Sequence, residues 1–208
     1  DDQFPSNAPP ILERGEGAFV WDTQENKYLD YGMGLRSVNL GYANKEVADA
    51  CYNEMVKGNN LTRASTTELH AAELLAELIP SVEMVKFAKH GSTVTTAAVK
   101  LARAYTNRKY IAIPFEQPFF SFDDWFIGST TLDKGTLKDT SNFTLRFHYN
   151  DLESLNKLFT KYAGQIAGVM LEPATSLSPC DDTCKIQQPC NTCPNNENNF
   201  LQKVKNIV

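Results

Sequence analysis

Strand-like and helix-like apolar segments alternate along residues 84–171, and this alternation constrains the fold more than any other feature of the sequence. Four short apolar runs typical of buried strands lie at 84–88, 110–113, 144–148 and 166–171. Runs with helical spacing lie between them at 93–105 and 152–162, the second with a predicted N-cap at Asn150. Strands joined through helices form parallel sheets with helices on both faces, so the sequence predicts an α/β fold.

The first 80 residues follow a different pattern. Two aromatic-rich runs, 17–21 and 27–31, flank a polar turn and predict a β-hairpin. One helix is expected to start after a cap at Asn44, and a second is expected over about 67–79. Cys51, at helical spacing between apolar residues, is expected to be a small buried side chain.

We expect two parts of unequal size. Residues 1–60 form an N-terminal arm, hairpin and helix, and residues 61–208 form part of a larger domain with a cysteine-rich insertion at about 176–196. The last helical pattern starts at Phe200 and has no strand after it, so the domain is expected to be unfinished at Val208. The sequence also begins without methionine, so the natural start is expected upstream.

Composition excludes several classes of function. The 20 basic and 25 acidic residues give a net charge of −5, without the basic clusters that nucleic-acid binding needs. No run approaches the roughly 20 apolar residues of a membrane helix, and the first residues lack the features of a secretory signal. His70, His90 and His148 have no nucleophile at a recognisable spacing, and His70 is expected to be solvated. No dinucleotide or P-loop glycine pattern occurs, and we expect a cytoplasmic protein that binds neither nucleic acid nor membrane.

The turn between the first strand and the first helix of the alternating region is a candidate anion site. Gly91 lets the backbone turn sharply, and the hydroxyls of Ser92 and Thr93 accompany the exposed amides of a helix start. Ordinary helix capping is the alternative explanation for these hydroxyls. Arg36, in a glycine-rich loop, is a candidate for binding a substrate carboxylate or phosphate, and an exposed arginine without a ligand is the alternative.

Three segments, 17–32, 90–108 and 166–173, carry a family resemblance. They match an opening hairpin, a small-residue helix that follows a Gly-Ser/Thr turn, and a strand that ends in Glu-Pro. In this order, over most of residues 11–173, they resemble the class III aminotransferases, within which the glutamate-1-semialdehyde aminomutase-like branch is the most similar. The resemblance implies the three-layer, mostly parallel sheet of the aspartate-aminotransferase-like fold (fold type I), incomplete in this chain. It also implies pyridoxal 5′-phosphate as cofactor and a homodimer.

The resemblance also implies which residues bind the cofactor. Gly91, Ser92 and Thr93 would hold its phosphate. Glu172 follows a strand at the edge where parallel sheets place their ligands, and a carboxylate on a surface loop is the alternative.

One aromatic side chain is expected to stack on the pyridine ring of the cofactor. The family pattern implies Phe119 for this role, since stacking requires only a ring face. Phe120 stands where the family usually has His, and Ser121 where it has Gly, so the tuning of the site is expected to differ. The alternative is that both phenylalanines are ordinary aromatic residues of the core.

The resemblance implies that the lysine that binds the cofactor and the acid at the pyridine nitrogen follow the Glu-Pro element. Neither motif occurs in the sequence, and Lys100 and Lys109 are better explained as a helix surface and a strand edge, so the catalytic residues stay unknown. The leading hypothesis is an enzyme that transfers an amino group between a small-molecule donor and acceptor, on an amino/keto or amino-aldehyde substrate. This chain is expected to be only part of that enzyme and to be inactive alone. An inactive fragment or pseudoenzyme partner is the alternative.

Four cysteines, Cys180, Cys184, Cys190 and Cys193, lie close together where the family has a variable loop. One Cys-x2-Cys pair and one looser pair are compatible with structural zinc. Free thiols are the main alternative, and disulfides fit a cytoplasmic protein less well. A zinc-stabilised interaction module is therefore a further hypothesis for the chain.

Overall fold

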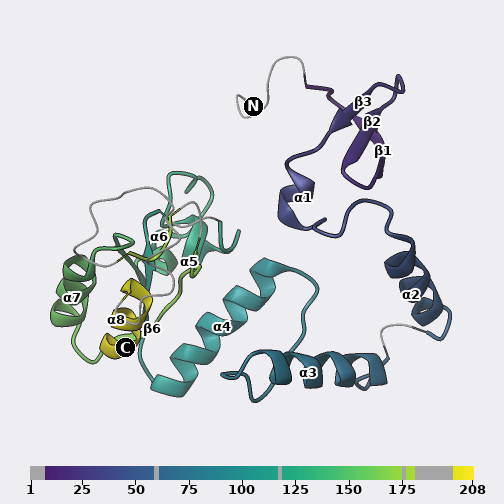
Figure 1. Cartoon of the computed structure of the whole chain (residues 1–208). Coiled ribbons are helices and arrows are strands. Elements are labelled where there is room, and N and C mark those ends of the chain that lie inside the picture. The colour runs from purple at the N-terminus through teal and green to yellow at the C-terminus, as the bar shows by residue number, and fades with distance from the viewer. Residues whose placement is uncertain (1–7, 59–60, 117–118, 175–176, 181–198) are drawn as a thin grey trace. The chain divides into compact units, whose positions relative to one another are not determined.

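The structure is a computed structural model that describes residues 8–58, 61–116, 119–174, 177–180 and 199–208. The chain divides into two compact units, 1–85 and 86–208, and each is described by itself (Figure 1). The domain boundary near residue 60 and the cysteine-rich insertion stay predictions. No helix among the described residues is long and apolar enough to span a bilayer.

The first unit contains an antiparallel sheet in the order β1-β2-β3. Its strands are β1 (Leu12–Glu16), β2 (Phe19–Asp22) and β3 (Lys27–Leu29), so the predicted hairpin is confirmed and β1 is an addition. Asp22 holds the β2–β3 turn, because its carboxylate accepts hydrogen bonds from the backbone amide and side-chain amide of Asn26 at 2.9 and 3.0 Å. The Asn26 side chain makes the largest contribution to lowering the pKa of Asp22 to about 2.

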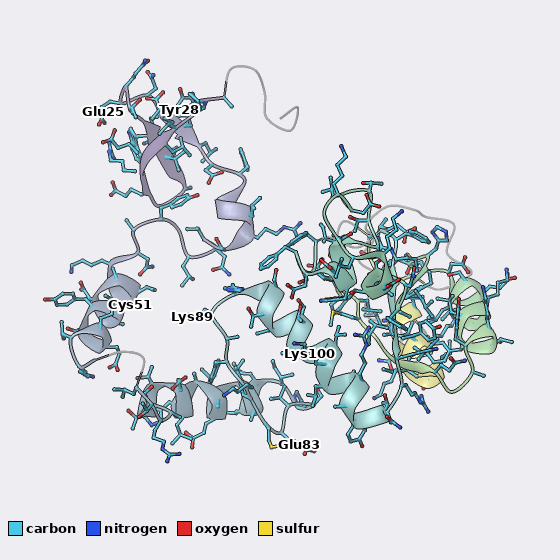
Figure 2. All side chains as sticks on the ribbon, turned by 180° about the vertical axis from the view of Figure 1, so that it is seen from behind. Glu25, Tyr28, Cys51, Glu83, Lys89 and Lys100 are labelled. Atoms are coloured by element: carbon cyan, nitrogen blue, oxygen red, sulfur yellow. The ribbon has the colours of Figure 1, made fainter. Side chains whose placement is uncertain are left out.

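The helix α2 (Lys45–Met55) begins as predicted. Asn44 is its N-cap, and the side chain of Asn44 accepts a hydrogen bond from the amide of Val47 at 3.1 Å. Cys51 is exposed on this helix, so the prediction that it is buried was wrong (Figure 2). No residue of α2 is buried, which means that its apolar stripe has no covering layer within the described residues.

Two further helices complete the first unit. The short α1 (Met33–Arg36) precedes α2, and α3 (Thr66–Leu78) follows it close to the predicted range. A capping box starts α3: Ser65 accepts from the amide of Glu68, and the Glu68 carboxylate accepts from the amide of Ser65 at 2.9 Å. His70 is exposed on α3, as predicted.

The second unit is built on a parallel sheet in the order β5-β4-β6. The central strand β4 (Tyr110–Pro114) pairs with β5 (Thr144–Phe147) on one side and β6 (Ile166–Val169) on the other. These three strands confirm the predicted parallel α/β fold. The fourth predicted strand, at 84–88, was wrong, because this run has no regular structure and no described strand pairs with it.

Helices cover both faces of the parallel sheet. They are α4 (Gly91–Thr106), α5 (Asp124–Ile127), α7 (Leu152–Lys161) and α8 (Phe200–Ile207), while the short α6 (Lys138–Ser141) contacts α5. One core cluster joins β5 to α7 and α8 through Phe147, Leu155 and Phe200, and a second joins β4 to α4 and α5 through Ile113 and Val99. The sheet is therefore the middle of three layers.

The loop that leads into α7 differs from its prediction. The N-cap is Asp151, whose side chain accepts a hydrogen bond from the amide of Ser154 at 2.9 Å. The prediction of Asn150 as N-cap was wrong, because Asn150 adopts a left-handed conformation (φ 64°) that asparagine tolerates better than most residues. Its side chain instead accepts from the amide of Cys180 at 2.9 Å and donates to the carbonyl of Ser178 at 3.0 Å.

Candidate functional site

The carboxyl end of β6, the first turns of α4 and the segment at Phe119 and Phe120 surround a hollow of about 580 Å³. It is lined by Val94, Thr95 and Ala98 of α4, by Phe119 and Phe120, and by Met170, Leu171, Glu172 and Pro173 after β6. Ligand sites of parallel sheets lie at this edge, and the volume is in the range of small-molecule pockets. Two residues singled out from the sequence, Phe119 and Glu172, therefore line one hollow.

The N-terminus of α4 provides backbone donors next to this hollow. His90 is the N-cap, and its carbonyl accepts hydrogen bonds from the amides of Thr93 at 3.2 Å and Val94 at 3.4 Å. The amides of Gly91 and Ser92 begin the helix and have no intrahelical acceptor, so they form the positive end of the helix dipole. A Cβ built on Gly91 would meet no atom within 4 Å, so the space beside its backbone is open.

The two hydroxyls at this helix start make contacts of different kinds. Ser92 is buried, and its Oγ accepts a hydrogen bond from the amide of Phe122 at 3.3 Å, which leaves its own hydrogen to be donated. Thr93 is exposed, and its Oγ1 lies 2.9 Å from His90 Nδ1. The N-cap side chain itself makes no capping hydrogen bond. Ser92 thus ties the helix start to the segment that carries the candidate aromatic rings.

The two candidate aromatics differ in exposure. Phe119 is 59% exposed, and its ring meets Phe126 edge to face at 5.7 Å between centroids, with the planes at 89°. Phe120 is partly buried and packs against the α4-side core, with its ring 5.4 Å from that of Phe126. Phe120 is therefore part of the core, whereas Phe119 presents a ring face outside it.

Glu172 lies near a tyrosine that the sequence reasoning missed. The hydroxyl of Tyr149 donates to the carbonyl of Pro173 at 2.6 Å and so holds the turn that carries Glu172. Burial, with the nearby charges of Cys180 and Glu172, raises the pKa of Tyr149 to about 12, which keeps this donor protonated. The signal in the sequence that could have indicated Tyr149 is a polar aromatic residue directly after a predicted strand.

A charged cluster at the ends of β4 and β5 also escaped the sequence reasoning. Burial raises the pKa of Glu116, but hydrogen bonds from the amide of Tyr149 (2.9 Å) and from His148 (2.7 Å) outweigh it and the pKa is lowered. Burial lowers the pKa of Arg146, whose guanidinium lies 5.2 Å from the ring centroid of Phe115. The cluster joins the ends of β4 and β5, and the Glu116 carboxylate has its hydrogen-bond partners within the protein.

The remaining predicted positions lie elsewhere. Arg36 is at the end of α1 in the first unit with φ 72°, and its ligand stays a prediction. Lys100 is exposed on α4, as expected for a helix surface (Figure 2), and Lys109 is exposed before β4.

The predicted zinc site cannot be followed on this structure. Cys180 is described, whereas Cys184, Cys190 and Cys193 lie outside the described residues. Among the residues with described positions, no group of three or more His, Cys, Asp or Glu side chains is arranged to hold a metal ion.

Comparisons with known proteins agree on one family. The family described as aminotransferase class-III matches residues 4–178. The chain is 35% identical over 174 residues to the glutamate-1-semialdehyde 2,1-aminomutase of Nitrosospira multiformis, an alignment that covers 79% of this chain and 41% of that protein. The chain thus spans about 41% of the length of this curated relative.

Solved structures extend the comparison to the fold. The PLP internal aldimine form of the FumI protein of Sphingopyxis sp. MTA144 has a TM-score of 0.75 and 29% identity, over 85% of this chain and 41% of that chain. A transaminase with PLP bound has a TM-score of 0.79 over 98% of this chain and 47% of that chain. At 20% identity, the second likeness shows the fold alone.

Proposed function

This chain belongs to the class III aminotransferases, and we propose that it binds pyridoxal 5′-phosphate as part of an enzyme that transfers amino groups. The partners in the reaction would be a small-molecule amino donor and acceptor, with an amino/keto or amino-aldehyde substrate. When bound, the cofactor supplies an electron sink that makes the bonds at the substrate amine carbon labile. The observation that carries the proposal is the hollow lined by Val94 and Thr95 of α4, by Phe119 and by Glu172. Gly91, Ser92 and Thr93 directly precede this lining on the same helix.

The helix start would hold the cofactor phosphate. The amides of Gly91 and Ser92 and the positive end of the α4 dipole favour a phosphate, and the hydroxyls of Ser92 and Thr93 add donors. The open space beside Gly91 supports this role, because a Cβ built there would meet no atom within 4 Å. The residues present therefore fit the group.

Phe119 and Glu172 would fix the rest of the cofactor. The exposed ring of Phe119 offers a face for stacking, and its edge-to-face contact with Phe126 restrains its orientation. Glu172 supplies a carboxylate from the other side of the hollow. Tyr149 holds the Pro173 carbonyl, so the turn that carries this carboxylate is kept in place without a change of charge near neutral pH.

Four further features belong to the proposal on the strength of the sequence and of the family resemblance. We propose a cytoplasmic homodimer, and Arg36 as a binding residue for a substrate carboxylate or phosphate. We also propose that this chain alone is inactive, because the lysine and acid motifs of the family do not occur in its sequence. Zinc held by Cys180, Cys184, Cys190 and Cys193 stays a separate prediction, which metal analysis with thiol titration would test.

The phosphate site is tested by replacing Ser92 and Thr93 with alanine in the full-length protein. Each hydrogen bond to a charged group is worth about 1.5 kcal/mol or more, so losing two should weaken pyridoxal phosphate binding by about 100-fold. Binding of pyridoxal, which lacks the phosphate, should not change. Absorbance titration of both ligands measures this.

The control variant for this test is Thr106→Ala, because Thr106 lies at the opposite end of α4. It should bind both ligands like the wild type. An equal loss for pyridoxal and pyridoxal phosphate in the double variant, or no loss for either, would remove Ser92 and Thr93 from the phosphate site.

A further inference from the structure

One hydroxyl of α4 joins the helix to the segment that follows Phe120. Thr96 Oγ1 donates a hydrogen bond to Asp123 Oδ2 at 2.5 Å and accepts one from Trp125 Nε1 at 2.8 Å. Ser121 Oγ lies 3.2 Å from the same oxygen and accepts a hydrogen bond from the amide of Asp123 at 3.1 Å. Three side chains of this segment therefore converge on Thr96.

The direction of each hydrogen bond in this network is determined. A hydroxyl has one hydrogen and two lone pairs, an indole can only donate, and a carboxylate can only accept. Thr96 therefore gives its hydrogen to Asp123 and accepts from Trp125, so the hydroxyl of Ser121 must donate to the second lone pair of Thr96. Every hydrogen and lone pair of Thr96 is used.

Two members of the network are shielded from water, whereas Thr96 and Asp123 are half-buried. Ser121 is fully buried and Trp125 is 4% exposed. Buried polar atoms that lose a partner carry the full penalty of desolvation, because water cannot replace the bond. Removing the Thr96 hydroxyl would therefore affect the whole segment rather than one contact.

The same segment determines where the ring of Phe119 lies. The Phe119 ring meets Phe126, the residue after Trp125 in α5, and Phe126 is buried. Thr95 Oγ1, the neighbour of Thr96 on α4, donates to the carbonyl of Phe120 at 2.8 Å. Two successive threonines thus connect α4 to the backbone before α5 and to α5 itself.

We propose that Thr96 is a positioning residue of the cofactor site, which holds the ring of Phe119 in the orientation that stacking requires. This inference rests on the proposed function, since the ring acts on the cofactor named there. It also gives a role to Ser121, which stands where the family pattern has Gly: glycine has no hydroxyl to join the network.

The test compares Thr96→Val, which keeps the shape but removes the hydroxyl, with Thr96→Ser, which keeps the hydroxyl. Both are made in the full-length protein, with Thr106→Val as the control on the same helix. The readouts are the dissociation constant of pyridoxal phosphate and the circular dichroism of the bound cofactor per occupied site, which reports the asymmetry of its surroundings. Thr96→Val should raise the dissociation constant about tenfold and reduce the dichroism, and Thr96→Ser should restore both.

Each other outcome has one meaning. If Thr96→Val lowers the melting temperature but leaves affinity and dichroism unchanged, Thr96 is only structural and the inference is wrong. If the wild type does not bind pyridoxal phosphate, the proposed function fails instead. If Thr96→Val does not fold, Ser121→Gly removes one of the three contacts of Thr96, together with the bond from the Asp123 amide. It should raise the dissociation constant two- to threefold, and an unchanged constant there overturns the inference.

Discussion

Replacing Tyr149 with phenylalanine should destabilise the protein at neutral pH but not at strongly alkaline pH. The hydroxyl of Tyr149 donates to the carbonyl of Pro173 at 2.6 Å, and its ring meets Phe200 at 4.9 Å between centroids. Phenylalanine keeps the ring contact and removes the hydrogen bond. Near neutral pH the variant should lose about 1 kcal/mol of unfolding free energy, the net worth of a buried hydrogen bond.

The pH dependence follows from the pKa of Tyr149. Burial raises it to about 12, from 10.0 for an exposed tyrosine. The unfolded chain therefore releases the phenol proton at a lower pH than the folded protein does, and wild-type stability falls as the pH rises from 10 to 12. Two pKa units correspond to about 2.7 kcal/mol, which solvent screening reduces to about 1–2 kcal/mol. The phenylalanine variant lacks this loss.

Urea unfolding of both proteins at a series of pH values from neutral to about 12 measures the difference in unfolding free energy. The difference should shrink from about 1 kcal/mol to about zero or change sign, because all other titrating groups are shared. Tyr105→Phe, at a residue that is 90% exposed, is the matched control. A constant difference for Tyr149→Phe across the same range would refute the reasoning from burial.

Three further predictions concern stability. Leu155→Ala should cost about 2–5 kcal/mol in urea unfolding, because Leu155 is fully buried. Leu158→Ala, partly buried on the same helix, should cost less, and equal losses would contradict the packing of α7. The pKa of Asp22 is held at about 2, against an ordinary 3.8, so wild-type stability should fall as the pH drops from about 4 to 2. Asp22→Asn should lose less stability over this range in acid titration by circular dichroism, because only the other carboxylates still titrate, and an equal fall would count against the assignment. Ser65→Ala should cost α3 about 1 kcal/mol of hydrogen-exchange protection, and unchanged protection would argue against the capping box.

Much of the second unit could be predicted because its periodic runs are long and distinct. Residues 110–113, 144–148 and 166–171 fell on β4, β5 and β6. The run at 84–88 failed, because an apolar pattern cannot show whether a partner strand is present. The strand β1 was missed for the opposite reason: its sequence LERGE has no alternation of apolar residues, and pairing with β2 alone makes it a strand.

Which of two similar neighbouring residues caps a helix could also not be predicted from the sequence. Asn150 and Asp151 are both good caps, and only the distant contact of Asn150 with Cys180 decides between them. The Gly91 turn was visible in the sequence because glycine, hydroxyls and a helix start are adjacent. Thr96 was not, because its partner Trp125 is 29 positions away and no spacing rule connects them.

The order of strands in the parallel sheet has a consequence for synthesis on the ribosome. β4 is the central strand, but both of its partners are made after it, and β6 starts about 50 residues later. At about 5–20 residues per second, that delay lasts roughly 3–10 s. Phe200 of α8, which fills the core on one face, emerges later still. Until β5 emerges the nascent chain exposes a strand with two open edges, and one edge stays open until β6 emerges, so this stage is exposed to edge-to-edge aggregation.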